Sequence, residues 1–227
     1  MPAGPFPLFP LHTVLFPRMP LPLHIFEERY KRMVRHCLET DQLFGAVLIQ
    51  DGREIDGSPA PHMVGTYARI HAAKELKEGR LNILVVGTDR FRLTEYMREP
   101  EPYMLGIGEP ICDAEEDQSV LTPLANDVSA LFQNYFHLLT EQAGVEMPEF
   151  ELPENPSDLS FVVAAAVQLP NPTRQEYLEI TDTVQRLTQE RELLTVEIAR
   201  VKTLTAGHNK QAKRLNAVRI KQLVNRN

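Results

Sequence analysis

The stretch that decides the fold of this chain is Phe6-Pro-Leu-Phe-Pro-Leu11, followed by Leu15-Phe-Pro17 and by Pro20-Leu-Pro-Leu-His-Ile-Phe-Glu-Glu-Arg-Tyr30. Six prolines fall from Pro5 through Pro22. A helix is excluded there, because proline lacks the backbone N–H and its ring clashes with the preceding turn. The stretch is also too apolar for a disordered tail. Proline within strand-like runs predicts edge strands, or extended segments that lie across a core.

A helix is expected directly after this stretch. Its apolar side chains recur at helical spacing, and its charged side chains lie largely on the opposite face. The apolar positions are Phe26, Tyr30, Met33, Val34, Cys37 and Leu38. On that face Cys37 is interpreted as a reduced, buried thiol, since neither it nor Cys112 belongs to a C-x-x-C pattern.

Three stretches, in this order, resemble the Lon N-terminal domain family, the non-catalytic amino-terminal module of Lon proteases that also occurs in free-standing proteins. They are the proline-rich opening, Val64-Gly-Thr-Tyr-Ala-Arg-Ile70 and Leu81-Asn-Ile-Leu-Val-Val-Gly-Thr-Asp-Arg-Phe-Arg-Leu93. The second resembles the family's VGT-x-A-x-I strand, and the third resembles a strand that ends in Gly before an Arg-x-x-(Ile/Leu) group. The resemblance extends over residues 5–206. It implies an α+β fold, in which a PUA-like β pseudobarrel of the Lon N-terminal type precedes a helical bundle with a long amphipathic helix.

The pattern of residues 5–112 is mainly that of strands, with the one inserted helix. The apolar run 43–49 predicts a strand buried on both faces, and residues 64–72 alternate as a half-buried strand does. Residues 50–63, between them, contain two Asp-Gly pairs and two prolines and are expected to form a long loop. Further strands are expected at 81–86, 91–96 and 103–111. Short strands joined by tight turns fit a small, closed antiparallel sheet.

After residue 113 the periodicity becomes helical, with helices expected at 121–140, from 156 to 168 and from 173 onward. A seam with alternating 4-3 spacing consists of Ile180, Val184, Leu187, Arg191, Leu194, Ile198 and Val201. It is either a helix face packed on its neighbours, which we favour, or a contact for self-association through helix 180–201. The expected domains are a PUA-like β subdomain with one helix (1–115), a helical subdomain (116–206) and a basic C-terminal tail (207–227).

Charge is distributed unevenly along the chain. The formal net charge is −7, yet the last thirty residues hold eight basic residues and no acidic one. Charge blocks of this kind usually form solvated faces. An alternative function is that of a nucleic-acid-associated PUA-like protein, which needs a concentrated positive surface. Its contacts would come from Arg90, Arg92, Lys210, Lys213 and Arg214. The acidic overall balance and the absence of tryptophan argue against it.

The sequence offers no motif for catalysis or for a cofactor. It lacks G-x-x-x-x-G-K-[ST] and G-x-S-x-G, and its seven histidines are scattered without the spacing of metal ligands. We therefore expect a non-enzyme that is ATP-independent and uses no cofactor and no metal. The chain has no apolar run of about eighteen residues and no secretory leader pattern. We accordingly expect a cytoplasmic protein without membrane contact.

The resemblance implies a polypeptide-recognition or adaptor module related to proteolysis, free-standing and without the ATPase and protease domains. Its expected partners are unfolded or tagged polypeptides, or a protease or chaperone. Such recognition needs exposed apolar surface, to which flexible methionines are suited. The candidate partner-binding residues are Phe16, Met19, Pro59, Pro61 and Met63.

Two alternatives stay open at this point. Each candidate residue can instead belong to the core, and we favour that for Phe16. A second alternative function is a small-molecule-binding or catalytic relic in the cavity of the barrel.

Overall fold

A computed structural model describes residues 4–55, 58–98, 100–146 and 150–206. The described residues form two compact units. The sheet unit lies within Met1–Cys112 and Val167–Thr181, and the helical unit comprises Asp113–Ala166 and the described residues from Asp182 onward. The chain thus leaves the sheet unit at residue 113 and returns to it once. The segment 167–181, which we expect from sequence in the helical subdomain, belongs to the sheet unit.

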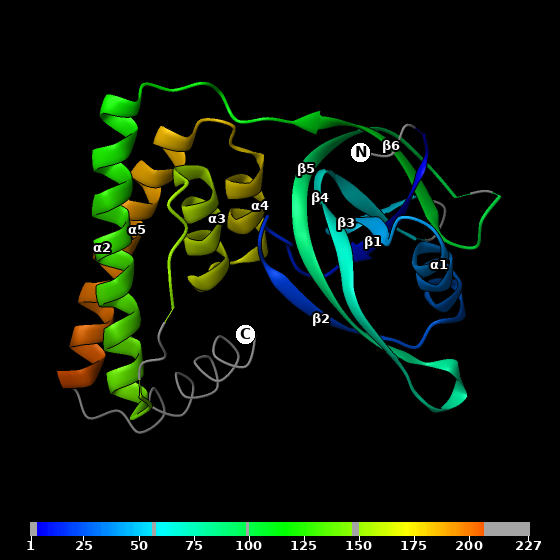
Figure 1. Ribbon diagram of the computed structural model, residues 1–227, viewed down its shortest axis with the longest axis horizontal. Coiled ribbons are helices and arrows are strands. Elements are labelled where there is room, and N and C mark those ends of the chain that lie inside the picture. Colours follow the sequence, from blue (N-terminus) through cyan, green and yellow to red (C-terminus); the bar gives the residue numbers. More distant parts are fainter. Residues whose placement is uncertain (1–3, 56–57, 99, 147–149, 207–227) are drawn as a thin grey trace. The chain divides into compact units, whose positions relative to one another are not determined.

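The described part of the sheet unit contains a six-stranded sheet. The strands are β1 (Phe6–Leu11), β2 (Pro20–Ile25), β3 (Leu43–Ile55), β4 (Ser58–Glu75), β5 (Leu81–Met97) and β6 (Met104–Ile111). Their order is β2-β5-β4-β3-β1-β6, and β6 also pairs with β5. Five strands therefore close into a ring, while β2 pairs with the first half of β5 (Figure 1). The α+β fold expected from sequence is confirmed.

An apolar cluster fills the ring. The ring of Phe6 meets those of Tyr67 and Phe91 edge to face, with centroids 5.0 and 5.1 Å apart, and the tilted pair Tyr67–Phe91 has centroids 4.7 Å apart. Gly45 and Gly65 are required beside these rings, because a Cβ atom at either position would lie within 2.8 Å of the Phe91 ring. The other members are Leu8, Leu43, Val47, Leu93 and Met104. These buried side chains pack inside the ring, where the second alternative function would place a ligand. That alternative stays a prediction.

Two strand predictions are wrong in their extents. The expected loop 50–63 is instead the end of a hairpin, in which Ile55 pairs with Ser58. A register shift between Ile49 and Glu54 absorbs the first Asp-Gly pair, so that this turn signal produces an irregularity within the strand. Likewise β5 runs unbroken where two strands are expected. Residues 87–89, between the two expected strands, are accommodated by a register shift of β5 against β4.

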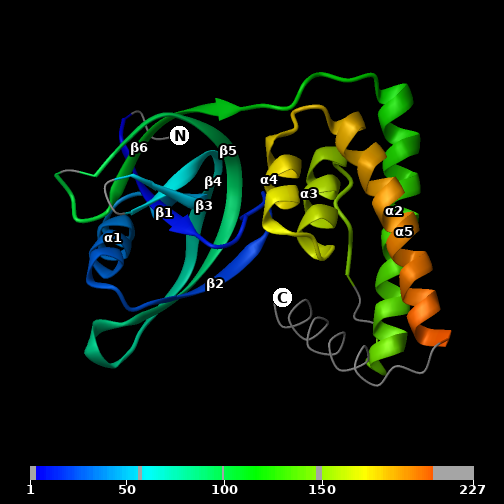
Figure 2. The same cartoon turned by 180° about the vertical axis from the view of Figure 1, so that it is seen from behind.

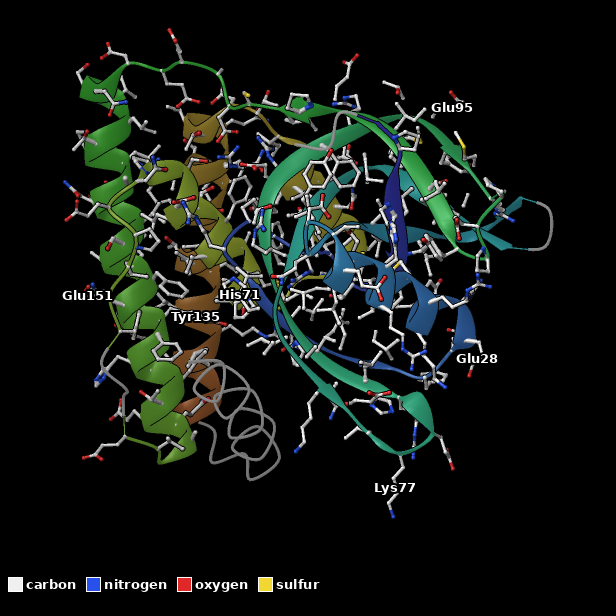
Figure 3. The ribbon with its side chains drawn as sticks, turned by 45° about the vertical axis from the view of Figure 1, so that its right-hand side comes forward. Glu28, His71, Lys77, Glu95, Tyr135 and Glu151 are labelled. Carbon is white, nitrogen blue, oxygen red and sulfur yellow. The ribbon has the colours of Figure 1, made fainter. Side chains whose placement is uncertain are left out.

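Helix α1 (Glu28–Glu39) packs against β1 and β3 and holds the hairpin between β4 and β5. The Tyr30 ring lies on that of Phe9, with centroids 4.2 Å apart. At the hairpin, Lys31 Nζ donates to the carbonyl of Glu78 over 2.9 Å. Figure 3 marks the helix at Glu28 and the hairpin tip, the short 3-10 turn η1 (Lys77–Gly79), at Lys77. The basic residues of α1 therefore fix the far end of the β4–β5 ribbon.

Helix α4 (Asn171–Glu179) belongs to the sheet unit and packs on β4 and on the loop that follows β1. Asn171 Nδ2 donates to the carbonyl of His12 over 2.7 Å. The buried Gln175 donates from Nε2 to the carbonyl of Val64 over 3.0 Å. These contacts give hydrogen-bond donors to two backbone carbonyls and attach a helix from the carboxyl half of the chain to the sheet unit.

The described helical unit contains α2 (Gln118–Ala143), α3 (Pro156–Ala166) and α5 (Thr183–Ala206). Asp117 caps α2 by accepting from the N–H of Ser119 over 2.8 Å, and Gly144 ends it with a φ of 63°. Figures 1 and 2 show α5 beside α2 from both sides, and Figure 3 marks the buried Tyr135 on α2. No helix in the described part of the chain is long and apolar enough to cross a membrane.

The 4-3 seam predicted from Ile180 is only partly correct. Ile180 is the C-cap of α4 and not part of α5, so the helix that bears the seam starts at Thr183. Arg191 is exposed, whereas Glu190 is fully buried. The buried positions of α5 are Thr183, Arg186, Leu187, Glu190, Leu194, Ile198 and Val201. They pack within the chain against α2 and α3, as we favour from sequence, which leaves self-association through this helix a prediction without support from the described contacts.

Candidate functional site

The structure places Phe16 and Met19 in the core. Their loop is fastened to β5, because the N–H of Arg18 donates to the carbonyl of Gly87 over 2.8 Å. Arg174 of α4 covers the loop, with its guanidinium 5.1 Å from the centre of the Phe16 ring and 3.8 Å from Met19 Sδ. Both side chains are buried beneath it. Neither offers surface to a partner, so the interpretation of these two residues as binding residues is corrected.

The other three candidates lie on β4. Pro59 pairs with Glu54 at the hairpin end, and Pro61 is buried opposite Ile49. Met63 keeps 38% of its side chain exposed. Among the predicted partner-binding residues whose side chains are described, Met63 is thus the one that is exposed to solvent. Its role in binding stays a prediction.

Of the five residues predicted for nucleic-acid contact, the structure describes two, Arg90 and Arg92, and only Arg92 is exposed. Arg90 is buried, and its Nη1 donates to the carbonyls of Leu178 and Ile180 over 2.7 Å each. This cation binds the carboxyl end of α4, where helix carbonyls lack intrahelical partners, so its role is structural. Arg92 is exposed on β5. The three tail residues of that prediction, Lys210, Lys213 and Arg214, lie outside the residues that the structure describes.

A different set of apolar side chains is exposed on the outer side of β2, β5 and β4. Pro22 of β2 lies opposite Leu84 of β5, which lies opposite Ala72 of β4. All three are exposed, and Leu84 keeps 37% of its surface. Neighbouring residues along each strand point to the opposite side. The corresponding row on the inner side is buried and consists of Leu21, Val85 and Ile70.

This outer row continues along β2. Pro20 and His24 lie two residues to either side of Pro22 and share its face. Phe26 follows β2 with 61% of its surface exposed, and its ring stacks on that of His24 at a centroid distance of 6.0 Å. Next to Pro20, the half-buried Val86 extends the apolar surface on β5. We call this surface the β2–β5 face; it consists of Pro20, Pro22, Phe26, Ala72, Leu84 and Val86.

The free edge of β2 is unsuited to pairing with another strand. The N–H of Gly87 donates to the carbonyl of Met19 over 3.0 Å, so odd-numbered residues of this segment turn their backbone groups toward β5. Pro20, Pro22 and His24 therefore turn theirs outward. Of these three, His24 alone has an N–H to donate. A partner strand needs regularly alternating donors and acceptors, and these prolines remove two of the donors.

The sheet unit contains one buried thiol. Burial raises the pKa of Cys37 to about 12, with a smaller contribution from the charge of Asp41. The thiol is therefore uncharged and not nucleophilic at neutral pH. Cys37 is free and buried, as expected from sequence. Among the described residues, no group of three or more His, Cys, Asp or Glu side chains is placed to hold a metal ion.

Sequence reasoning missed the β2–β5 face because Phe26 fits the helical spacing of the following apolar residues. In the structure α1 begins after it, at Glu28, and Phe26 continues the strand pattern. The alternation of Pro20, Pro22, His24 and Phe26 could have indicated that these side chains share one face of an edge strand. Proline is tolerated in an edge strand where its missing N–H would face outward. The matching alternation on β5 is Asn82, Leu84 and Val86.

Comparison with known proteins finds relatives over most of the chain. The family described as "ATP-dependent protease La (LON) substrate-binding domain" matches residues 5–196. The Lon protease of Syntrophus aciditrophicus is 29% identical over 80% of this chain, and Lon protease 1 of Thermus thermophilus is 28% identical over 86% of it. The matched regions make up 24% and 25% of those proteins, so this chain spans about a quarter of their length.

Two solved structures share the fold. The Lon N-terminal domain protein from Xanthomonas campestris superimposes with a TM-score of 0.59 at 27% sequence identity, over 82% of this chain and 96% of that one. The N terminal domain of Mycobacterium avium complex Lon protease gives a TM-score of 0.63 at 15% identity, over 85% and 98%. At that identity the second likeness is one of fold alone.

Proposed function

Since this chain belongs to the family of Lon substrate-binding domains, we propose that it recognises polypeptides and that its β2–β5 face contacts their apolar segments. The observation that carries the proposal is the exposed row Pro22–Leu84 beside Phe26, on a sheet whose other side is buried. The part of the Lon proteases that this chain matches is the non-catalytic, substrate-binding one. The proposed role is accordingly binding, without chemistry on the bound chain.

The face has properties that suit capture of unfolded chains. Unfolded polypeptides expose apolar side chains that a folded protein buries, and covering apolar surface on both partners is favourable. An exposed phenylalanine supplies a large contact area with few rotatable bonds, as at many binding hot spots. Prolines present a rigid apolar surface whose ordering costs little conformational entropy. Polypeptides that merely share an apolar stretch are thereby bound without a defined sequence.

The test is binding of a fluorescein-labelled, reduced and alkylated polypeptide, measured by anisotropy. Replacement of the two exposed anchors, Phe26→Ser and Leu84→Thr, is expected to weaken binding about tenfold in the double variant. The matched control is Val196→Ser on α5, where 64% of an apolar side chain is exposed outside the face. Thermal unfolding of every variant shows whether the fold is kept.

The result separates this proposal from its alternatives. Unchanged affinity in a folded Phe26→Ser/Leu84→Thr protein overturns the assignment of the face. Loss of binding in Met63→Ser, with the face variants unaffected, moves the site to the predicted methionine. Binding to a single-stranded RNA of similar length, with no affinity for the polypeptide, supports the nucleic-acid alternative. An adaptor role would show as a stable complex with a Lon-type protease or a chaperone, which size-exclusion chromatography of the mixture detects.

A further inference from the structure

The β2–β5 face is bordered by positive charge on β4. Arg69 lies opposite Val86, and Lys74 lies opposite Asn82, which places both cations beside the apolar row. Both are exposed, as is His71 at the register shift between them. The stretches that build this surface, residues 20–26, 69–74 and 82–86, contain no Asp or Glu. In a chain of net charge −7 the surface is thus a local reversal of charge.

The acidic residues that border these stretches are already paired elsewhere. Glu27, after Phe26, binds Arg29 at 2.8 Å. Glu75, after Lys74, binds Arg35 of α1 at 3.3 Å and lies opposite the buried Leu81, on the other side of the sheet. The positive charge beside the face is therefore not neutralised by these neighbours. Arg69 donates one hydrogen bond, from Nη1 to the backbone carbonyl of Asp41 over 3.3 Å, which orients its guanidinium. The carboxylate of Asp41 accepts instead from the N–H of Leu43 and the hydroxyl of Thr40.

We propose that this surface selects extended polypeptide segments in which apolar side chains lie next to Asp or Glu. The inference rests on the proposed function and adds the class of segment that is bound. Apolar side chains lie against Phe26, Pro22 and Leu84. Carboxylates reach Arg69 or Lys74 on β4, which is one strand from Leu84 and two strands from Pro22, or about 5 and 10 Å. Cationic side chains in the bound segment are disfavoured by repulsion from the same two residues.

The prolines on the edge of β2 determine which groups of this chain recognise the bound segment. A partner that added a strand to the sheet would be held by backbone hydrogen bonds, largely independent of charge. The prolines at positions 20 and 22 remove the donors for that mode. The bound segment is therefore recognised by side chains on the outer face. Because Arg69 and Lys74 lie beside the apolar side chains there, segments with carboxylates next to apolar groups are selected.

The experiment compares three labelled, unstructured peptides that share one apolar core and differ in their flanking residues: Asp and Glu, Ser and Asn, or Lys. Anisotropy at low salt is expected to rank them in that order. The acidic peptide should bind about fivefold more tightly than the neutral one, since two exposed ion pairs contribute modestly. At about 0.5 M salt the difference should largely disappear, because exposed charges are screened.

The decisive variant is Arg69→Gln/Lys74→Gln, which should bind the acidic and neutral peptides equally and keep the affinity for the neutral one. Its charge-matched control, Lys77→Gln/Lys202→Gln, removes two exposed cations outside the face and should keep the preference. Equal binding of all three peptides by the parent protein, or a preference that survives Arg69→Gln/Lys74→Gln, overturns this inference and leaves the proposed function standing. Failure of every peptide to bind overturns both.

Discussion

Arg186 and Glu190 lie one turn apart on α5, and both are fully buried. The guanidinium of Arg186 nevertheless binds the carboxylate of Asp113 and not that of Glu190. Arg186 makes two parallel hydrogen bonds to Asp113, Nη1 to Oδ1 and Nη2 to Oδ2, each 2.8 Å long. Its Nε donates to Ser160 Oγ over 2.8 Å. Among the described residues, neither carboxyl oxygen of Glu190 has a hydrogen-bond partner. Within the described part of the helical unit, the charge of Arg186 is therefore satisfied, whereas the buried carboxyl group of Glu190 has no hydrogen-bond partner.

Replacement of Glu190 is predicted to stabilise the protein at neutral pH. Burial raises the pKa of this carboxyl well above its usual value of 4.5, and the charge of Arg186 lowers it by a smaller amount. Glu190→Met removes the unpartnered group at similar length and should raise the free energy of unfolding by about 1–3 kcal/mol at pH 7. Urea denaturation followed by circular dichroism measures the change.

The stability gained by replacing Glu190 is predicted to increase as pH rises above 4.5. In the folded state the carboxyl stays protonated above pH 4.5, whereas in the unfolded state it ionises there, so unfolding releases a proton. The stability of the parent protein thus falls as pH rises from 4.5 toward the folded pKa, and Glu190→Gln lacks this fall. The exposed Glu192→Gln is the control and should behave as the parent does. Lower stability of Glu190→Gln and Glu190→Met at every pH would show that the carboxyl has a stabilising partner.

Removal of the charge at Asp113 is predicted to be strongly destabilising. Asp113→Asn leaves the buried Arg186 without its carboxylate and should lower the free energy of unfolding by about 3–5 kcal/mol. The exposed Glu115→Gln, two residues away, loses the same charge and should change stability by less than about 0.5 kcal/mol. Chemical denaturation of the two variants provides the comparison. Equal effects in both would mean that net charge, and not the buried pair, sets the stability.

Arg90 is predicted to hold α4 on the sheet unit. Arg90→Met leaves the carbonyls of Leu178 and Ile180 without their donor, which should lower stability by about 2–4 kcal/mol. Arg92→Met on the same strand is exposed and should stay within about 0.5 kcal/mol of the parent. Thermal unfolding measures both, and RNA affinity measured in parallel tests the alternative function. A folded, equally stable Arg90→Met protein with reduced RNA affinity would return Arg90 to the role of a nucleic-acid contact.

Local patterns in the sequence were sufficient to place a strand at residues 64–72 and the helix that follows the proline-rich opening. Residues 64–72 belong to β4, as their sequence indicates, but their predicted alternation is wrong: residues 64–68 are all buried, Tyr67 among them, and Ala72 is exposed. The proline-rich segments form β1, paired with β3 and β6, and the edge strand β2. These features depend on side-chain period and on the missing proline N–H, which a single sequence displays directly.

The errors arose where a distant element decides the environment. Phe16 and Met19 are buried because Arg174, 155 residues after Met19, packs over their loop, and no local pattern contains that contact. On α5 the predicted seam placed Arg191 inward, as a charge in an otherwise apolar row. The structure buries the neighbouring Glu190 instead, and it also buries Arg186, which binds Asp113 from a distant part of the sequence. Identification of such pairings requires the three-dimensional arrangement of the helical unit.

The prolines of β2 are predicted to keep the sheet from pairing with further strands. Pro20→Thr/Pro22→Thr restores two outward N–H groups on an apolar edge and creates a template for strand addition. The variant should self-associate in a concentration-dependent manner relative to the parent, as measured by sedimentation velocity. His24→Thr, at a position that already has an N–H, is the control for strand propensity and should sediment as the parent does. If Pro20→Thr/Pro22→Thr sediments unchanged at high concentration, the edge is protected by something other than its prolines. The argument for recognition through side chains would then lose its support.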